Sequence, residues 1–185
     1  MLKIIAGKFK GFKLKNFDSV KIRPTPGKVR EAVFDILGSD TLSSNFLDLF
    51  AGTGAVGIEA LSRGAQSVTF VDRDKQAIGL IKNNLKKINS TDFSYIIKSN
   101  YLNAFEKMET DQKRYGIIFI DPPYKKDFAL KVMIKIDKYH IAKRNSIIVL
   151  QHHVDEKIEN NFKNMALIKE KKYGNTSISI YIYKN

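Results

Sequence analysis

The stretch that decides the fold is Asp48-Leu49-Phe50-Ala51-Gly52-Thr53-Gly54, which ends a short apolar run and precedes a helix candidate. Gly52 and Gly54, together with Gly57, fit the spacing G-x-G-x-x-G. Glycine at these places lets the backbone turn tightly and approach a ligand without a Cβ clash. The order strand, glycine loop, helix is typical of the first unit of a nucleotide-binding α/β fold.

Outward from this loop, short apolar runs alternate with amphipathic segments, the pattern of a parallel α/β sheet. The strand candidates are Phe46–Phe50, Ser67–Val71, Phe93–Ile97, Gly116–Ile120 and Ser146–Leu150. The helix candidates are Ala55–Arg63, Lys75–Ile88, Tyr101–Lys107, Phe128–Lys138 and a shorter one near Asp155–Phe162. Finally, Ala166–Lys172 and Ser177–Tyr183 flank a turn that contains Gly174, which predicts an antiparallel hairpin.

The first 40 residues have a different pattern. Residues 1–22 predict short alternating strands with a turn at Gly7–Gly11. Four apolar residues with helical spacing follow before Gly38, namely Val29, Val33, Phe34 and Leu37. We therefore predict a small N-terminal hairpin and helix extension over residues 1–40, and one compact domain over residues 41–185.

The charge of the chain is unevenly distributed. Lys and Arg number 32 against 19 Asp and Glu, and residues 1–30 alone hold nine cations against one anion. The remaining +5 over 155 residues fits a lysine-rich composition, because 26 of the 32 cations are lysine. The concentration at the N-terminus indicates an anionic polymer partner such as nucleic acid.

Composition also excludes several classes of function. The chain has no cysteine, which excludes a disulfide framework, a thiolate zinc site and a cysteine nucleophile. No apolar run approaches the roughly 18 residues of a membrane span, and the apolar start is too short for a signal peptide. We expect a cytoplasmic protein that requires no metal.

Asp72 ends the second strand candidate, 20 residues after Gly52. A carboxylate at that place can accept both ribose hydroxyls of an adenosine, so this half of the chain is predicted to bind an adenosine cofactor. A dinucleotide carries a pyrophosphate that binds a helix N-terminus. Asp48, just before the loop, favours a cationic group instead, and therefore favours S-adenosylmethionine over a dinucleotide.

A second constellation, Asp121-Pro122-Pro123-Tyr124, follows the buried fourth strand candidate. Two prolines fix φ and remove two donors, so the loop is stiff. Ligands bind at the carboxyl ends of strands in open α/β sheets. Asp121 and the Pro122 carbonyl can accept the two N–H groups of an exocyclic amino group, and Tyr124 can stack on the base. These residues predict amino methylation, which needs neither a metal nor a covalent nucleophile.

In this order the two loops and Asp72 resemble a class I S-adenosylmethionine-dependent amino-methyltransferase. The closer resemblance is to the RsmD family of small-subunit ribosomal RNA guanine-N2 methyltransferases, and it covers nearly the whole chain. Four stretches carry it: Gly7–Gly11, Arg23–Thr25 with Val29–Leu37, Leu47–Gly54 continuing through Gly57–Ala65, and Asp121–Tyr124.

The resemblance implies a Rossmann-like, mostly parallel sheet of seven strands with an antiparallel last strand. It implies methyl transfer to N2 of a guanine in 16S ribosomal RNA, within a partly assembled subunit, by a monomer. The cofactor residues that it implies are Asp48, Phe50, Gly52, Gly54, Asp72 and Asn100. Asp121, Pro122 and Tyr124 hold the target amino group. The RNA-contact candidates are Lys8, Lys10, Lys13, Arg23 and Arg30.

Two positions depart from the family pattern. Asp72 stands where Glu is more usual, and a shorter carboxylate can still reach a ribose. Gln151 follows the fifth strand candidate where relatives often carry Glu, so any role of that acid is unsupported here.

Other functions stay open as alternatives. A DNA or RNA adenine-N6 methyltransferase can use the same tetrapeptide, but the DNA enzymes usually carry a sizeable target-recognition insertion. Here only 66 residues separate Gly54 from Asp121, and 61 follow Tyr124. A dehydrogenase would need a hydride-handling site, which the sequence does not offer. A catalytically silent nucleic-acid-binding module is disfavoured by the intact Asp121 and Tyr124.

Overall fold

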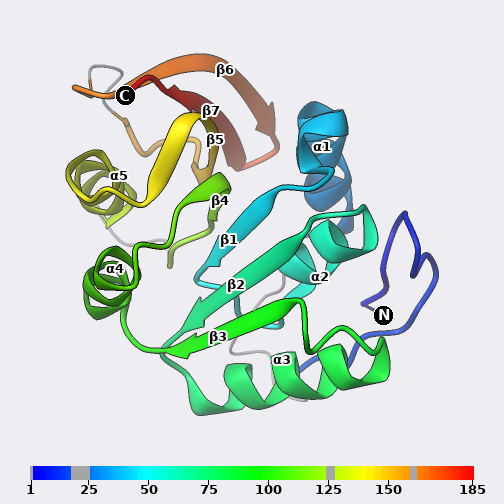
Figure 1. The fold of residues 1–185 in the computed structure, drawn as a ribbon. Helices are drawn as coiled ribbons and strands as arrows, with labels where there is room; N and C mark the ends of the chain where they lie inside the picture. Colours follow the sequence, from blue (N-terminus) through cyan, green and yellow to red (C-terminus); the bar gives the residue numbers. More distant parts are fainter. Residues whose placement is uncertain (1, 18–25, 124–127, 159–161) are drawn as a thin grey trace. The chain divides into compact units, whose positions relative to one another are not determined.

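The alternation of apolar runs and amphipathic segments folds as alternating strands and helices in a computed structural model that describes residues 2–17, 26–123, 128–158 and 162–185. The chain divides into two units, residues 1–101 and 102–185. Figure 1 labels their helices and strands and colours the chain from blue at the N-terminus to red at the C-terminus. The boundary expected at residue 40 falls inside the first unit, and the division into residues 1–40 and 41–185 stays a prediction.

The first unit is built on three parallel strands. They are β1 (Asn45–Leu49), β2 (Ser67–Asp72) and β3 (Ser94–Lys98), in the order β3-β2-β1. Helix α2 (Ala55–Ser62) connects β1 to β2, and α3 (Lys75–Lys87) connects β2 to β3. The side chains of Phe46, Leu47 and Phe70 are fully buried. These elements lie within two residues of the predicted ranges.

The N-terminal residues of this unit form a short hairpin and a helix. Leu2 and Leu14, and Ile4 and Phe12, are joined by backbone hydrogen bonds of 3.0 Å, around an antiparallel bridge between Lys3 and Lys13. We call residues 2–17 the N-terminal arm. Helix α1 (Gly27–Leu37) follows as predicted, and the 3-10 helix η1 (Gly38–Thr41) leads into β1.

The second unit holds four strands in the order β4-β5-β7-β6. They are β4 (Tyr115–Ile120), β5 (Ala142–His153), β6 (Met165–Tyr173) and β7 (Thr176–Tyr183). Strands β4 and β5 are parallel, whereas β7 is antiparallel to both β5 and β6. Helices α4 (Tyr101–Thr110) and α5 (Phe128–Lys138) precede β4 and β5 in the chain. The predicted α/β class, with seven mostly parallel strands and an antiparallel last strand, is confirmed.

The helix expected near Asp155–Phe162 is wrong for the part of it that the structure describes, residues 155–158 and 162. The Val154 amide donates to the Asn175 carbonyl at 3.1 Å, which extends the pairing of β5 with β7. The Glu156 amide then closes a turn onto the His153 carbonyl at 3.0 Å. Pairing with β7 prolongs β5 to His153, so the residues directly after it form a turn at the strand end and not the expected helix.

No helix among the described residues is both long and apolar enough to cross a membrane.

Candidate functional site

The glycine loop between β1 and α2 contains three residues in the left-handed region. Phe50 has φ 69°, Gly52 has φ 53° and Gly54 has φ 75°. A Cβ on Gly54 would lie 2.9 Å from Cγ1 of Ile81, so glycine serves both the turn and the packing there. Phe50 is the unusual member, because a bulky residue at positive φ costs on the order of 1–3 kcal/mol, and such strain clusters at ligand sites.

Asp72, at the carboxyl end of β2, holds the glycine loop in place. Its Oδ2 accepts the Gly52 amide at 2.8 Å, and its Oδ1 accepts the Asp74 amide at 2.9 Å. An ionised carboxylate has about four acceptor positions, so these two bonds leave capacity for further donors. Asp72 is only half-buried, and its predicted role as the acceptor of ribose hydroxyls stays a prediction.

Asp48 is almost completely buried, with 1% of its surface exposed. Its Oδ2 accepts the Gly57 amide at 2.8 Å. Gly57 lies in the first turn of α2, where amides have no partner within the helix. The carboxylate therefore neutralises the positive end of α2, the place where a pyrophosphate would bind in a dinucleotide site.

The loops that follow β1, β2 and β3 meet at one edge of the first unit. The Ser99 amide donates to the Asp72 carbonyl at 3.0 Å. The rings of Phe50 and Tyr101 lie with their centroids 5.8 Å apart. Asn100, between Ser99 and Tyr101, is exposed at this edge. The structure thus brings together all six predicted cofactor residues, which belong to the first unit.

Tyr101 is a member of this cluster that sequence reasoning missed. It begins α4 and was expected only as a helix residue. Its signal in the sequence is its position, directly after Asn100 and at the end of a strand connection, where ligand-binding side chains gather in α/β sheets.

The tetrapeptide Asp121–Tyr124 belongs to the second unit and follows β4, whose residues are buried except for the half-buried Gly116. Asp121 is half-buried, Pro122 is buried and Pro123 is exposed. Tyr124 lies outside the described residues.

The N-terminal arm presents a basic surface. Lys8, Lys10 and Lys13, which we call the arm lysines, are all exposed. Residues 2–17 carry five lysines and no acidic residue. Lys13 lies on the bridge with Lys3, whereas Lys8 and Lys10 lie in the turn. Arg23 lies outside the described residues.

Arg30 has a different environment, because only 2% of its surface is exposed. Its Nη2 donates to the Lys3 carbonyl at 2.6 Å, and its Nε lies 3.7 Å from Oε2 of Glu59. Burial lowers the pKa of the Arg30 guanidinium, and the nearby Glu59 carboxylate opposes that shift. In this conformation Arg30 cannot reach a phosphate, so it binds the arm to the core and we leave it out of the RNA surface.

Glu59, on α2, is completely buried and anchors the arm. Its two carboxylate oxygens accept the amides of Ile5 and Ala6 at 2.8 and 2.9 Å. Further along, the Lys8 amide donates to the Ser62 carbonyl at 2.7 Å, at the last residue of α2. Gly7 comes so close that a Cβ would lie 1.9 Å from the Ser62 oxygen. The arm is therefore fastened to the C-terminal half of α2.

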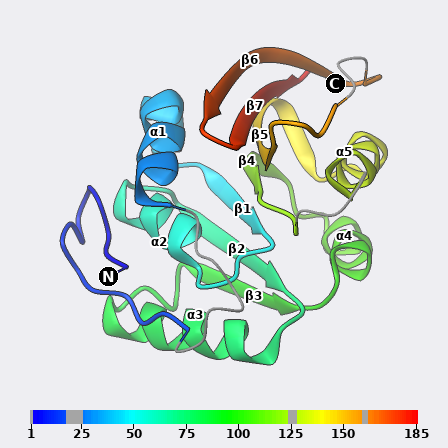
Figure 2. The same cartoon turned by 180° about the vertical axis from the view of Figure 1, so that it is seen from behind.

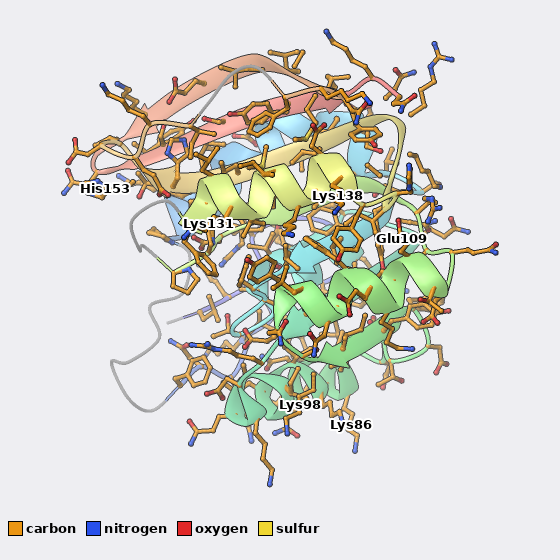
Figure 3. The ribbon with its side chains drawn as sticks, turned by 90° about the vertical axis from the view of Figure 1, so that its left-hand side faces the viewer. Lys86, Lys98, Glu109, Lys131, Lys138 and His153 are labelled. Atoms are coloured by element: carbon orange, nitrogen blue, oxygen red, sulfur yellow. The ribbon has the colours of Figure 1, made fainter. Side chains whose placement is uncertain are left out.

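Exposed lysines also lie outside the arm. Figure 3 labels Lys86 on α3, Lys98 on β3, and Lys131 and Lys138 on α5, and all four are exposed. This distribution agrees with a lysine-rich composition. Neither α3 nor β3 contains an acidic residue either, so the arm is distinguished only by its place within residues 1–30, which hold nine cations against one anion.

A family model described as "Conserved hypothetical protein 95" matches residues 2–182. A Buchnera aphidicola protein named Ribosomal RNA small subunit methyltransferase D is 35% identical over 179 residues, which are 97% of this chain and 92% of the relative. The Haemophilus influenzae protein of the same name is 33% identical over 181 residues, 97% of this chain and 93% of the relative. The chain belongs to the family that this model describes.

Membership confirms the resemblance to RsmD proteins. Solved structures agree with it over the full length. The Escherichia coli structure named "Putative methyltransferase yhhF" has a TM-score of 0.86 and 27% sequence identity, and the match covers 98% of this chain and 97% of the Escherichia coli chain. A hypothetical protein of Thermus thermophilus has a TM-score of 0.81 and 26% sequence identity, and the match covers 97% of this chain and 98% of the Thermus chain.

Proposed function

We propose that this RsmD-family chain is an S-adenosylmethionine-dependent methyltransferase that methylates N2 of a guanine in small-subunit ribosomal RNA. The observation that carries the proposal is the edge of the first unit, where Asp72 binds the glycine loop and Asp48 caps α2. The names of the Buchnera and Haemophilus relatives support ribosomal RNA as the substrate class.

The buried Asp48 decides between the two adenosine cofactors. A pyrophosphate would meet a carboxylate at the helix end that it needs, at a cost that burial increases. S-adenosylmethionine carries a cationic sulfonium and, at its amino acid end, a cationic ammonium group, and a carboxylate is compatible with both cations. Asp72 would then hold the ribose, and Asn100 the adenine. When bound, the cofactor supplies an electrophilic methyl group with a neutral thioether as its leaving group.

Asp121 and the Pro122 carbonyl accept the two N–H groups of the target amino group in this proposal. An exocyclic amino nitrogen is a weak nucleophile, because its lone pair is delocalised into the ring. Two acceptors polarise the nitrogen and direct its lone pair, and Tyr124 stacks on the extruded base. On methylation the nitrogen would lose one proton, and the Asp121 carboxylate, which accepts one of its N–H groups, would take that proton. Alignment of this kind supplies a large share of the rate enhancement.

The arm lysines serve as phosphate contacts in this proposal, which orient the RNA without reading its sequence. The substrate is a partly assembled small subunit, and the enzyme acts as a monomer. Both statements come from the family resemblance.

An adenine-N6 methyltransferase is the second candidate function. A Vibrio type II methyltransferase is 31% identical over 109 residues, which are 58% of this chain but 26% of that protein. The match therefore leaves most of the Vibrio protein without a counterpart, whereas the RsmD relatives are covered almost completely. We favour guanine because the resemblance to the RsmD family implies it, and the chain covers the RsmD relatives almost completely.

The test is methylation of small subunits from a strain that lacks its own RsmD enzyme, followed by mass spectrometry of the nucleosides. We expect N2-methylguanosine, and N6-methyladenosine would refute the choice of base. Asp121→Ala should abolish transfer while S-adenosylhomocysteine affinity, measured by calorimetry, stays unchanged. Asp72→Ala should weaken that affinity, and Asp35→Ala, at an exposed position of α1, is the control. Transfer at the wild-type rate by Asp121→Ala would refute the mechanism.

A further inference from the structure

Asn84, on the buried face of α3, has no exposed surface. Its amide contacts two separate segments of the first unit. The Lys15 amide donates to its Oδ1 at 2.8 Å, and its Nδ2 donates to the Lys15 carbonyl at 3.1 Å. The same Nδ2 lies 3.4 Å from the Thr53 carbonyl, in the middle of the glycine loop. One side chain therefore connects the arm to the loop.

The contact with Lys15 has the form of a strand pairing, in which the side-chain amide replaces a neighbouring backbone. It fixes the last part of the arm, whereas Glu59 fixes the first part. Figure 2 shows the arm, in dark blue, passing α2 and reaching α3. Glu59 and Ser62 bind the arm from α2, whereas Asn84 binds both the arm and the cofactor loop.

The contact with Thr53 falls at the centre of the loop. The neighbouring Gly52 amide is held by Asp72, and the Gly54 amide donates to the Ala51 carbonyl at 2.7 Å. A ligand that contacts the loop acts on the same backbone segment whose carbonyl Asn84 binds. A small change of the loop conformation changes the geometry at Asn84, and through it the geometry at Lys15.

We propose that Asn84 is a positioning residue that couples the N-terminal arm to the cofactor loop, so that RNA on the arm and S-adenosylmethionine on the loop strengthen each other's binding. This inference rests on the proposed function, which assigns those two ligands. Coupling between two sites is reciprocal, and typical coupling changes each affinity by about 5-fold to 150-fold. The enzyme would then hold its cofactor most tightly when its substrate is in place.

The experiment measures the dissociation constant of S-adenosylhomocysteine by calorimetry, with and without a saturating concentration of partly assembled small subunits. In the wild-type chain we expect RNA to tighten this constant by about fivefold or more. We call the dissociation constant without small subunits divided by that with them the coupling ratio. If both ligands bind and the coupling ratio is one, the coupling is overturned and the proposed function stands. Failure of the wild type to bind either ligand would overturn both.

Asn84→Ala should bring the coupling ratio close to one, because the side chain that links the arm to the glycine loop is removed. Asn83→Ala is the matched control, since Asn83 is the preceding residue of the same helix and is exposed. It should keep the wild-type ratio. A wild-type ratio in folded Asn84→Ala, verified by circular dichroism, would overturn the proposal.

A second measurement needs no variant, in case Asn84→Ala fails to fold. S-adenosylhomocysteine alone should slow hydrogen exchange of the Lys15 amide severalfold, because that amide donates to Asn84. Unchanged exchange at Lys15 in the cofactor-bound wild type would contradict the coupling.

Discussion

Replacing Glu59 by alanine tests how firmly the N-terminal arm is anchored. The carboxylate is completely buried and accepts the amides of Ile5 and Ala6 as well as Nε of Arg63, at 2.8 to 3.0 Å. Glu59→Ala leaves these donors without their acceptor. It also leaves the buried guanidinium of Arg30 without the carboxylate that lies 3.7 Å away.

The magnitude follows from these contacts. A buried donor that loses its acceptor costs roughly 1–3 kcal/mol, and the two amides are only partly buried, so about 1 kcal/mol each applies. Breaking a buried ion pair costs about 3–5 kcal/mol. Because Nε of Arg30 lies as far as 3.7 Å from Oε2 of Glu59, we expect a smaller cost for this pair, about 2 kcal/mol. Arg63 is partly exposed and can turn to water. The free energy of unfolding should therefore fall by about 4 kcal/mol.

Urea unfolding followed by circular dichroism measures this change. Glu59→Gln keeps one acceptor oxygen and should lose about half as much. Glu31→Ala, at an exposed position of α1, is the control and should stay within about 0.5 kcal/mol of the wild type. A loss below about 1 kcal/mol for Glu59→Ala would refute the reasoning, because solvent would then replace the carboxylate.

Four further variants test other parts of the molecule. Alanine at all three arm lysines should reduce the slope of log K for RNA binding against log salt concentration by about 2 to 3. Alanine at the exposed Lys86, Lys131 and Lys138 is the control and should leave that slope unchanged. An unaltered slope in the arm variant would mean that the arm lysines reflect only the lysine-rich composition of the chain. Gly57→Ala should destabilise by about 1–2 kcal/mol, because its Cβ would lie 2.3 Å from a buried ring of β2. Gly79→Ala, with nothing within 4 Å, should instead stabilise by about 0.5–1 kcal/mol through helix propensity, and equal urea midpoints for the two would contradict this contrast. Burial raises the pKa of Tyr181 to about 12 in the folded chain, whereas the unfolded chain has a tyrosine pKa of about 10. The free energy of unfolding should therefore fall as the pH rises from about 10 to about 12. Tyr181→Phe should reduce this fall, as measured by urea unfolding at each pH.

The sequence was sufficient for elements whose pattern is local. The glycine loop, the strand ends and the hairpin at Gly174 were predicted because turn chemistry and apolar period act over a few residues. The helix near Asp155 failed because pairing between β5 and β7, a contact between distant segments, overrides local helical spacing. Long-range pairing of this kind leaves little trace in the segment itself.

The same distinction separates the site residues. The positions of Asp48 and Asp72 beside the glycine loop were predicted because both residues lie at the ends of strands that adjoin the loop, and their role in binding a cofactor stays a prediction. Arg30 was expected at an RNA surface because its charge was visible, whereas its burial depends on Glu59, 29 residues away in the chain. Asn84 and Tyr101 were missed, since an asparagine within a helix and a tyrosine at a helix start have no distinctive signal of their own.

Helix α2 has a consequence for how this family can vary. Its N-terminus carries the glycine loop, and its last residue, Ser62, holds the turn of the arm. Eight residues of helix span roughly 12 Å, so α2 acts as a fixed spacer between cofactor and arm. Inserting a single residue would lengthen that spacer by about 1.5 Å and rotate the anchor of the arm by about 100°. The length of α2 is therefore constrained in addition to its side chains, all of which are buried.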